Sequence, residues 1–456
     1  MGRIYVNFVY TTFNVITVDI IIIVSNCVEP KCRSSLQKNI RYWGISMSKK
    51  NDDFFRKKNI WSEVKDELLS CYLVPYVQKI LTTNRPLFYV DCFAGKGRFD
   101  DGKKGSPLIA LEIINDCLER TRMQRARVES CFIELNHAED LEKNIREYRD
   151  TRVEIDIVSG KFEENIESKL QGKRGYNVFL YIDPYGIKAL DCGMFDKFAG
   201  YGFNSIEMLI NMNSFGFIRD ACSVFGVAFS DVEPFEELVE YDPSSAKSIQ
   251  TLNNIAGGDY WISIVADYKA RKITGYEAEQ RFSKEYCERL RKKYKYVLNM
   301  PIRLKEGQRP KYRMIHATNH VDGCILMYKN ICKRWEHLGY IQTQGQGSLW
   351  NLTMEGDIVD DDTICVLMKQ HVSQYTSFTR LNVVIADFLL KHGTLCNAET
   401  IQNTIKYLED IGFIDVNRYY RSNRNKKPRR RFYTEDGDRV VELRKSQRQI
   451  TLFDNV

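Results

Sequence analysis

The sequence predicts an α/β protein whose main part is a mostly parallel sheet covered by helices on both faces. Five short apolar runs alternate with helical patterns between residues 87 and 211, and this alternation favours a parallel sheet. Near the C-terminus, two helical patterns are followed by a basic hairpin. That order predicts a winged-helix domain at residues 376–445.

The elements of the main part follow in order. Apolar residues at helical spacing cover 59–81, where Pro75 is expected to kink or divide the helix. The expected strands are 87–92, 127–134, 153–158, 177–182 and 205–211. The expected helices between them are 107–120, 138–149 and 162–170, with Ser106 as the N-cap of the first.

A less regular stretch at about 215–275 predicts a helical insertion. A helix with a basic face at 276–295 and a hairpin at 296–304 and 311–317 complete a domain placed at residues 50–335. Residues 336–375 are interpreted as a linker region, with a strand pair at 340–343 and 348–352 and an acidic stretch at 357–362.

The C-terminal module is expected to contain helices at 381–389 and 398–411 and a wing with strands at 413–418 and 431–433. Residues 446–456 are interpreted as a tail. At the other end, residues 1–46 are expected to be a non-domain extension, with the natural start at Met47. The apolar run from Phe8 to Val24 is broken by Asp19, so a membrane anchor is only the alternative.

Composition sets broad limits on function. The chain has 456 residues, a hydrophobic fraction of 43% and a net charge of +7, which permits an anionic partner without requiring one. Its 13 cysteines include no CxxC pair. We therefore expect reduced thiols, a cytoplasmic protein and no metal site.

The first strand ends in a glycine turn that predicts a ligand site. Its sequence is Asp91-Cys92-Phe93-Ala94-Gly95-Lys96-Gly97. Glycines let a ligand approach the backbone closely, and the turn lacks the G-K-[ST] sequence of a triphosphate-binding loop. The predicted cofactor-binding residues here are Asp91, Phe93, Ala94, Gly95 and Gly97. A plain strand–helix turn is the alternative.

Two more strand ends add to this prediction. Glu134 closes the second strand, where a carboxylate can accept hydrogen bonds from ribose hydroxyls. Phe162, after the third strand, is a further predicted cofactor-binding residue.

The fourth strand ends in Asp183-Pro184-Tyr185-Gly186. Ligands of open α/β sheets bind at the carboxyl ends of the strands, so this segment is expected beside the glycine turn. Asp183 and a backbone carbonyl could accept the protons of an exocyclic amine while Tyr185 stacks on its ring. Together the strand ends predict a Rossmann-like S-adenosylmethionine (SAM) site with Asp183, Pro184 and Tyr185 as catalytic residues.

Residues 91–97, Gly105-Ser106-Pro107-Leu108 and 181–186 together resemble the three-Cys-motif partner protein (TcmP) family over about residues 59–332. The resemblance implies a class I SAM methyltransferase-like fold and a companion protein that carries the three cysteines. One departure concerns the substrate edge, because amino-methyltransferases of DNA and RNA usually have a second proline where Tyr185 stands.

The wing is strongly basic and predicts a nucleic-acid partner, DNA or RNA. Its cationic residues are Arg418, Arg421, Arg424, Lys426, Lys427, Arg429, Arg430 and Arg431. The aromatic residues Tyr419, Tyr420 and Phe432 could stack on bases. We therefore expect a SAM-dependent methyltransferase that acts on nucleic acid, at a base exocyclic amine, with the companion protein. The alternative is a non-catalytic adaptor built on the same fold.

Overall fold

A computed structural model describes residues 55–58, 60–121, 126–229, 248–302, 312–342 and 359–447. The predicted extension at 1–46, the predicted strand at 348–352 and the tail beyond Gln447 lie outside the described residues.

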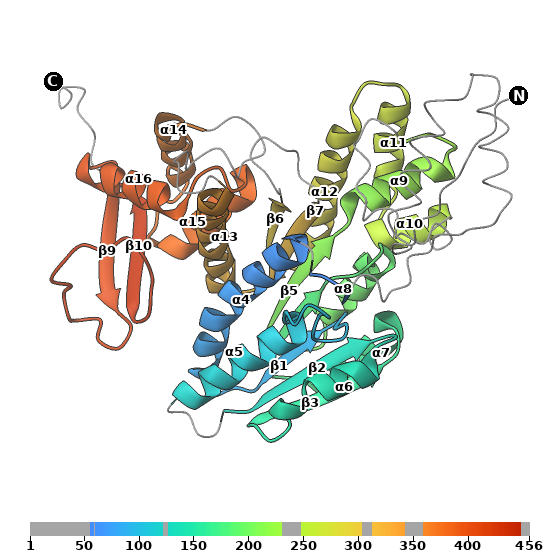
Figure 1. Ribbon diagram of the computed structural model, residues 1–456. Helices are drawn as coiled ribbons and strands as arrows, with labels where there is room; N and C mark the ends of the chain where they lie inside the picture. Colours follow the sequence, from blue (N-terminus) through green and yellow to red (C-terminus); the bar gives the residue numbers. More distant parts are fainter. Residues whose placement is uncertain are drawn as a thin grey trace, which may run out of the picture. The chain divides into compact units, whose positions relative to one another are not determined.

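The main part is built on a seven-stranded mixed sheet with the order β3-β2-β1-β4-β5-β7-β6 (Figure 1). The strands are β1 (Leu87–Asp91), β2 (Val128–Glu134), β3 (Val153–Ser159), β4 (Asn177–Ile182), β5 (Ser205–Met212), β6 (Tyr296–Ile302) and β7 (Tyr312–Thr318). β1 to β5 are parallel, and β7 runs antiparallel to both β5 and β6. This arrangement is typical of the Rossmann-like fold of class I methyltransferases.

The central strands are buried on both faces because both faces carry helices. Every residue of β1, β2 and β4 is buried, which explains their nearly continuous apolar sequences. One face is covered by α4 (Ile60–Leu81), α5 (Ser106–Arg120), α6 (Ala138–Asn144) and α13 (Val321–Gln342). The other is covered by α7 (Phe162–Leu170), α8 (Cys192–Phe198) and the helices that follow β5.

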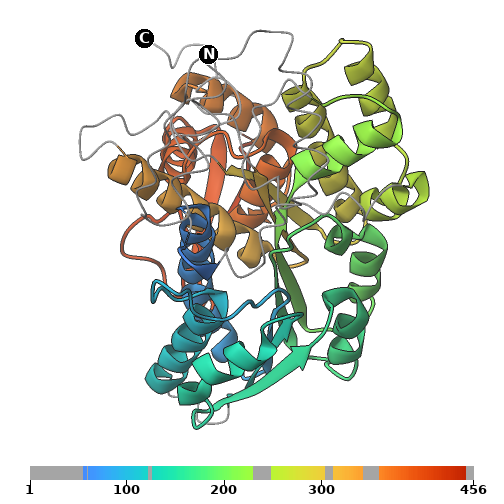
Figure 2. The ribbon, with the colours of Figure 1, turned by 45° about the vertical axis from the view of Figure 1, so that its right-hand side comes forward.

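Those later helices are α9 (Ser214–Val224), α10 (Ile249–Ala256), α11 (Trp261–Lys269) and α12 (Gly275–Arg291). They lie together beyond the sheet on the side of α8 (Figure 2). Phe217 of α9 stacks on Phe282 of α12 with ring centroids 3.9 Å apart. Trp261 of α11 is fully buried against the same cluster. The predicted insertion at about 215–275 is therefore helical in its described parts.

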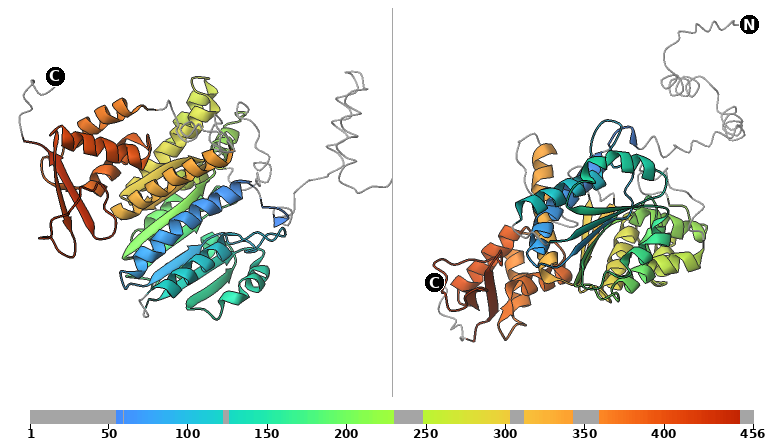
Figure 3. Two further views of the ribbon diagram at one scale, coloured as in Figure 1. Left: turned by 60° about the vertical axis from the view of Figure 1, so that its left-hand side comes forward. Right: turned by 90° about the horizontal axis from the view of Figure 1, so that it is seen from below.

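A C-terminal module follows, with a separate three-stranded antiparallel sheet in the order β8-β10-β9. Its elements are α14 (Asp361–Val372), β8 (Thr379–Arg380), α15 (Leu381–His392), α16 (Ala398–Asp410), β9 (Ile414–Tyr420) and β10 (Arg439–Lys445). Its apolar core is continuous with the core under α4 and α13. Figure 3 shows α13 lying alongside α4, and α15 packs on α13 and β6.

Several predicted boundaries were wrong. Pro75 neither divides nor ends α4, which is continuous to Leu81. Residues 340–342 belong to α13 instead of a strand. The acidic end of the predicted linker instead begins α14, because the Asp360 side chain accepts a hydrogen bond from the backbone N–H of Thr363 and acids in the first turn complement the helix dipole.

The second strand of the wing was also misplaced. Residues 431–433 are not a strand, and β9 pairs instead with β10, where Val441 lies opposite Arg418. Val440, Val441 and Leu443 supply buried side chains that anchor β10 in the core. Arg418 consequently lies on β9, and the other basic residues lie in a long loop, residues 421–438, which we call the basic loop.

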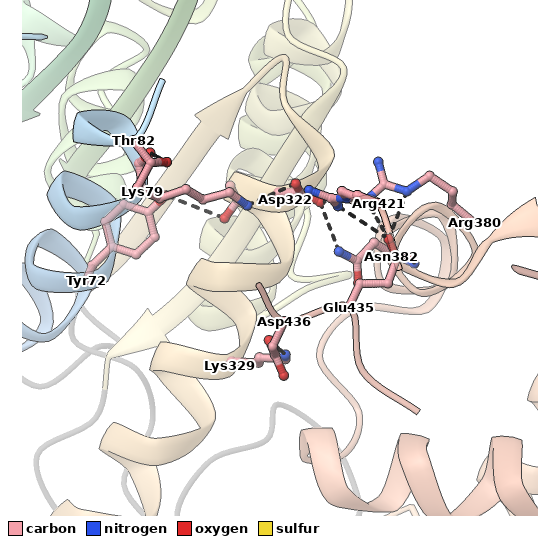
Figure 4. A network of polar contacts seen from close by, with 11 residues as sticks. Tyr72, Lys79, Thr82, Asp322, Lys329, Arg380, Asn382, Arg421, Glu435 and Asp436 are labelled. Atoms are coloured by element: carbon pink, nitrogen blue, oxygen red, sulfur yellow. Dashed lines mark hydrogen bonds and ion pairs between the residues drawn. The ribbon is translucent and has the colours of Figure 1, made fainter. Parts of the chain in front are cut away.

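An ionic network ties the base of the basic loop to the main part (Figure 4). Arg380 contacts Asp322 of α13 at 3.1 Å and Glu435 of the loop at 2.5 Å. Lys79 at the end of α4 reaches the same Asp322 at 2.9 Å. The side chain of Glu435 is fully buried, so its charge depends on Arg380 and on Arg421, 3.9 Å away.

Within the described residues, no helix is long and apolar enough to cross a membrane.

Replacing Arg380 should therefore destabilise the fold strongly. In Arg380→Ala, Glu435 loses its closest cation while it stays buried, a change that typically costs about 3–5 kcal/mol. Arg120→Ala is the control, because Arg120 pairs with Asp116 at the surface, where ion pairs contribute about 0–1 kcal/mol. Urea unfolding measures both free energies, and equal losses would contradict this account.

Candidate functional site

The carboxyl ends of β1 and β4 meet at the point where the strand order reverses, which is where open α/β sheets bind ligands. After β1 the chain makes the predicted glycine turn. Gly95 and Gly97 have φ of +64° and +76°, and a Cβ on Gly97 would lie 2.8 Å from Leu141 Cδ1. The backbone N–H of Gly105 donates to the Gly97 carbonyl at 2.8 Å. The backbone conformation therefore favours glycine at position 97, and a larger residue there would also displace the end of the Leu141 side chain.

Glu134 lies beside this turn, as predicted, but its carboxylate also holds the local backbone. Oε2 accepts a hydrogen bond from Gly95 N at 2.7 Å, and Oε1 accepts from the backbone N–H groups of Asn136 and His137 at 2.9 and 3.1 Å. Glu134 is buried. A carboxylate has about four acceptor positions, so capacity remains for a ligand hydroxyl at Oε2.

Asp91, at the end of β1, is completely buried and only partly satisfied. Oδ1 accepts from the backbone N–H of Phe93 at 3.2 Å, and Ser106 contributes a side-chain hydrogen bond instead of capping α5. Oδ2 is buried without a hydrogen-bond partner. Burial raises the pKa of Asp91 to about 7. The two hydrogen bonds favour the ionised form and oppose this rise, whereas the negative charges of Asp183 and Asp66 add to it.

The Asp183 carboxylate is held by two donors that sequence reasoning missed. Lys65 of α4 contacts Oδ1 and Oδ2 at 2.9 and 2.6 Å, and Asn211 Nδ2 donates to Oδ1 at 2.6 Å. Pro184 is buried, and Tyr185 is 50% exposed. Asn211 could have been found, because it ends the predicted fifth strand at the same sheet edge. The helical pattern of α4 gave no sign of where Lys65 would lie.

A second ion pair from the N-terminal segment lies nearby. Lys58 contacts Asp66 at 2.5 Å and donates to the backbone carbonyl of Lys104 at 2.6 Å. Burial raises the pKa of Asp66 to about 6, although Lys58 opposes the shift. Asp66, Asp91 and Asp183 thus form a cluster of carboxylates close enough to affect one another's charge.

Aromatic rings line the remaining predicted cofactor positions. Phe162 is buried and packs against Phe93, with ring centroids 5.3 Å apart. Phe93 is only partly buried, so its ring is the more accessible of the two. Ala94 is buried under the glycine turn. Phe55 covers the turn from outside: a Cβ on Gly95 would lie 3.0 Å from its ring.

Two observations indicate that the residues at this sheet edge could bind SAM. The orphaned Oδ2 of Asp91 and the neighbouring acids favour a ligand with cationic groups, and SAM carries a sulfonium and an ammonium group. The glycine turn, Glu134 and Phe93 together offer a close backbone approach, an acceptor for hydroxyls and a ring surface. Among the described residues, no group of three or more histidine, cysteine or acidic side chains could hold a metal ion.

The predicted nucleic-acid-binding residues divide into two groups. Arg418 has 10% of its side chain exposed and holds Glu409 at 2.5 Å and the backbone carbonyl of Phe432 at 2.8 Å. Arg431 pairs with Asp410 at 2.6 Å. These two residues fasten the basic loop to α16. The other six are exposed: Arg421, Arg424, Lys426, Lys427, Arg429 and Arg430.

The aromatic residues of the basic loop and β9 are already covered by cations. Arg424 lies over Tyr419 at 5.0 Å, and Lys426 lies over Tyr420 at 5.6 Å. Between β9 and the loop is a hollow of about 780 Å³, with Lys427, Arg429 and Arg430 in its wall. Its chemistry favours phosphate groups over stacked bases.

Comparisons with known proteins assign no family. No family model matches the chain, and no curated protein matches it. Solved structures to which the chain shows a distant similarity include a spermidine synthase from Thermotoga maritima (10% identity over 62% of this chain and 68% of that chain, TM-score 0.27). The chain is also similar to PKMT2 from Rickettsia typhi, with 9% identity over 55% of this chain and 52% of that chain and a TM-score of 0.26. It is similar to loganic acid methyltransferase with SAH, with 9% identity over 84% of this chain and 95% of that chain and a TM-score of 0.24. The fold assignment rests on the strand order.

The buried Asp91 predicts a specific pH dependence of stability. Because its folded-state pKa lies near 7, above the usual 3.8, the folded state binds an extra proton between these values, and Asp91 lowers stability as pH rises through that window. The effect is at most on the order of 4 kcal/mol. Asp91→Asn mimics the neutral acid and has no charge to develop at this position. Its melting temperature relative to that of the wild type should therefore rise as the pH is raised from about 5 to about 8. Exposed Asp150→Asn is the control, and parallel pH curves for Asp91→Asn and wild type would contradict the assignment.

Proposed function

We propose that this protein is a SAM-dependent methyltransferase that acts on nucleic acid, at the exocyclic amine of a base. The observation that carries the proposal is the meeting of the glycine turn and Asp183 at the switch point of a methyltransferase-type sheet. SAM, when bound, supplies an electrophilic methyl group. Asp91, Glu134 and Phe93 are the residues proposed to hold it.

Asp183 is proposed to act on the acceptor nitrogen. Its oxygens already accept two N–H donors, one of them the ammonium group of Lys65. A substrate amine would replace Lys65 as donor, and Asp183 would orient the nitrogen and take up the proton that it loses. Tyr185, half exposed at the same edge, provides a ring on which the base could stack. Pro184 fixes the backbone between them.

The C-terminal module is proposed to be a winged helix that binds the nucleic-acid backbone through its basic loop. Its element order, helix, short strand, two helices and hairpin, supports this interpretation. α16 is poorly suited to entering a groove, because its exposed face carries Glu399 and Asp410 beside Lys406. The cations of the basic loop therefore make the main contact, and it is sequence-independent.

The companion protein implied by the TcmP resemblance belongs to the same proposal. The proposed cofactor-binding and catalytic residues are all supplied by this chain, so the companion is proposed to help select the target. The alternative function is a non-catalytic adaptor. It is favoured by one observation, the occupation of Asp183 by Lys65 and Asn211, which leaves the carboxylate already satisfied.

Methyl transfer from radiolabelled SAM to DNA and to RNA distinguishes the two. Asp183→Ala should lower kcat by about 100-fold or more, because positioning and proton uptake are both lost, while SAM affinity measured by calorimetry stays within a few-fold. Lys188→Ala, an exposed residue shortly after the same strand, is the matched control.

Two results would contradict catalysis. One is an absence of transfer by wild type to either nucleic acid when the companion is supplied. The other is an unchanged rate in Asp183→Ala. Either result, with nucleic-acid binding retained, would favour the adaptor.

The basic loop makes a second prediction. Replacing Lys427, Arg429 and Arg430 together with alanine should reduce the slope of log affinity against log salt by about 0.9 for each lost contact with duplex phosphate. The charge-matched control is Arg85→Ala, Arg120→Ala and Lys143→Ala, at exposed positions of the main part. Fluorescence anisotropy of a labelled oligonucleotide measures the slope, and an equal change in both triple variants would argue against the basic loop as the contact.

A further inference from the structure

We propose that a hollow between α12, β6 and the end of α15 is a second phosphate-binding site and that it receives the backbone of the bound nucleic acid. This inference rests on the proposed function, but the site is separate from both the sheet edge and the basic loop. It also gives a role to the basic face of α12, which the proposed chemistry leaves unused.

The hollow has a volume of about 500 Å³, within the range of ligand sites. One wall is α12, with Lys284 and Arg291. The end of α15 and the turn after it also line the hollow, with Lys391 and His392. Asn299 of β6 and Arg313 of β7 also line it. The hollow thus lies where the main part meets the C-terminal module.

Positive charge predominates in these walls. Lys284, Arg291, Lys391 and Arg313 face a single acidic lining residue, Glu288. Two of the four cations are paired: Arg313 with the buried Glu279 at 2.6 Å, and Arg291 with Glu288. Lys284 and Lys391 have no acidic partner among the described residues. Two exposed ammonium groups, one on α12 and one on α15, therefore remain for an anion.

Arg291 adds an unsatisfied donor. Its Nη2 donates to the Val297 carbonyl at 3.0 Å, whereas its Nε is buried with no hydrogen-bond partner. An unmade hydrogen bond from a buried charged group is costly. An oxyanion in the hollow is the kind of ligand that would remove this cost, since guanidinium groups bind phosphate oxygens readily.

The lining also indicates which part of a nucleic acid enters. Among the described residues, no Phe, Tyr or Trp lines the hollow, so a base would find no ring of those residues to stack on. Burial and the charge of Lys391 lower the pKa of His392, which therefore stays neutral and adds no charge. These features suit a phosphate group with its sugar, which is what a backbone presents.

The test uses the full chain and two charge-matched double variants. Lys284→Ala with Lys391→Ala removes the unpaired cations of the hollow. Lys292→Ala with Lys293→Ala removes two exposed lysines just after α12 that do not line it. Anisotropy of a labelled duplex is recorded over a salt series, and inorganic phosphate is titrated by calorimetry. All four positions are exposed, so similar melting temperatures are expected.

The hollow variant should lose about 0.9 from the salt slope for one lost phosphate contact and should bind inorganic phosphate at least several-fold more weakly. The control should retain both properties. Equal behaviour of the two variants would overturn the inference. Loss of phosphate binding with an unchanged duplex slope would show a site for free phosphate, which contradicts the backbone assignment. If wild type binds no nucleic acid, the proposed function fails separately, and the phosphate titration alone decides whether the hollow is an anion site.

Discussion

The placement of negative charge at the carboxyl edge of the sheet is the constraint on which the rest of the site depends. Asp66, Asp91 and Asp183 lie near one another in buried or half-buried positions, where like charges and lost hydration both oppose ionisation. Two lysines from the N-terminal segment compensate: Lys58 pairs with Asp66 and Lys65 with Asp183. Asp91 has no such cation, and this is where the charge of a ligand would have the largest effect.

α4 connects this edge to the C-terminal module. Lys65 near its start contacts Asp183, and Lys79 near its end contacts Asp322 in the network that holds Glu435. Lys65 and Lys79 are 14 positions apart, which corresponds to about 21 Å of helix. Because Pro75 does not break the helix, the spacing between the candidate site and the base of the basic loop is set by a rigid element. A nucleic acid held by the loop would therefore meet the sheet edge at a fixed distance.

The sequence predicted most of the sheet because its signals are local. β4 is an apolar run that ends at Asp183, and the glycine turn follows β1 directly. The proximity of the strand ends could be predicted from the topology alone, because the carboxyl ends of parallel strands lie at the same edge of the sheet. The partners of those strand ends could not, since Lys65 reaches Asp183 across 118 positions of the chain. The course of the wing could not be predicted either, because β9 pairs with β10 across the whole basic loop, and the sequence does not show that Arg418 pairs with Glu409 on α16.

A SAM site at this edge can be tested by calorimetric titration of the wild-type protein with SAM at pH 8, where Asp91 is mostly ionised. We expect one bound SAM per chain and weaker binding at pH 6, because protonation of Asp91 removes the charge that favours a cationic ligand. An absence of binding at both pH values would contradict a SAM site at this edge. Equal affinity at both would contradict the role given to Asp91.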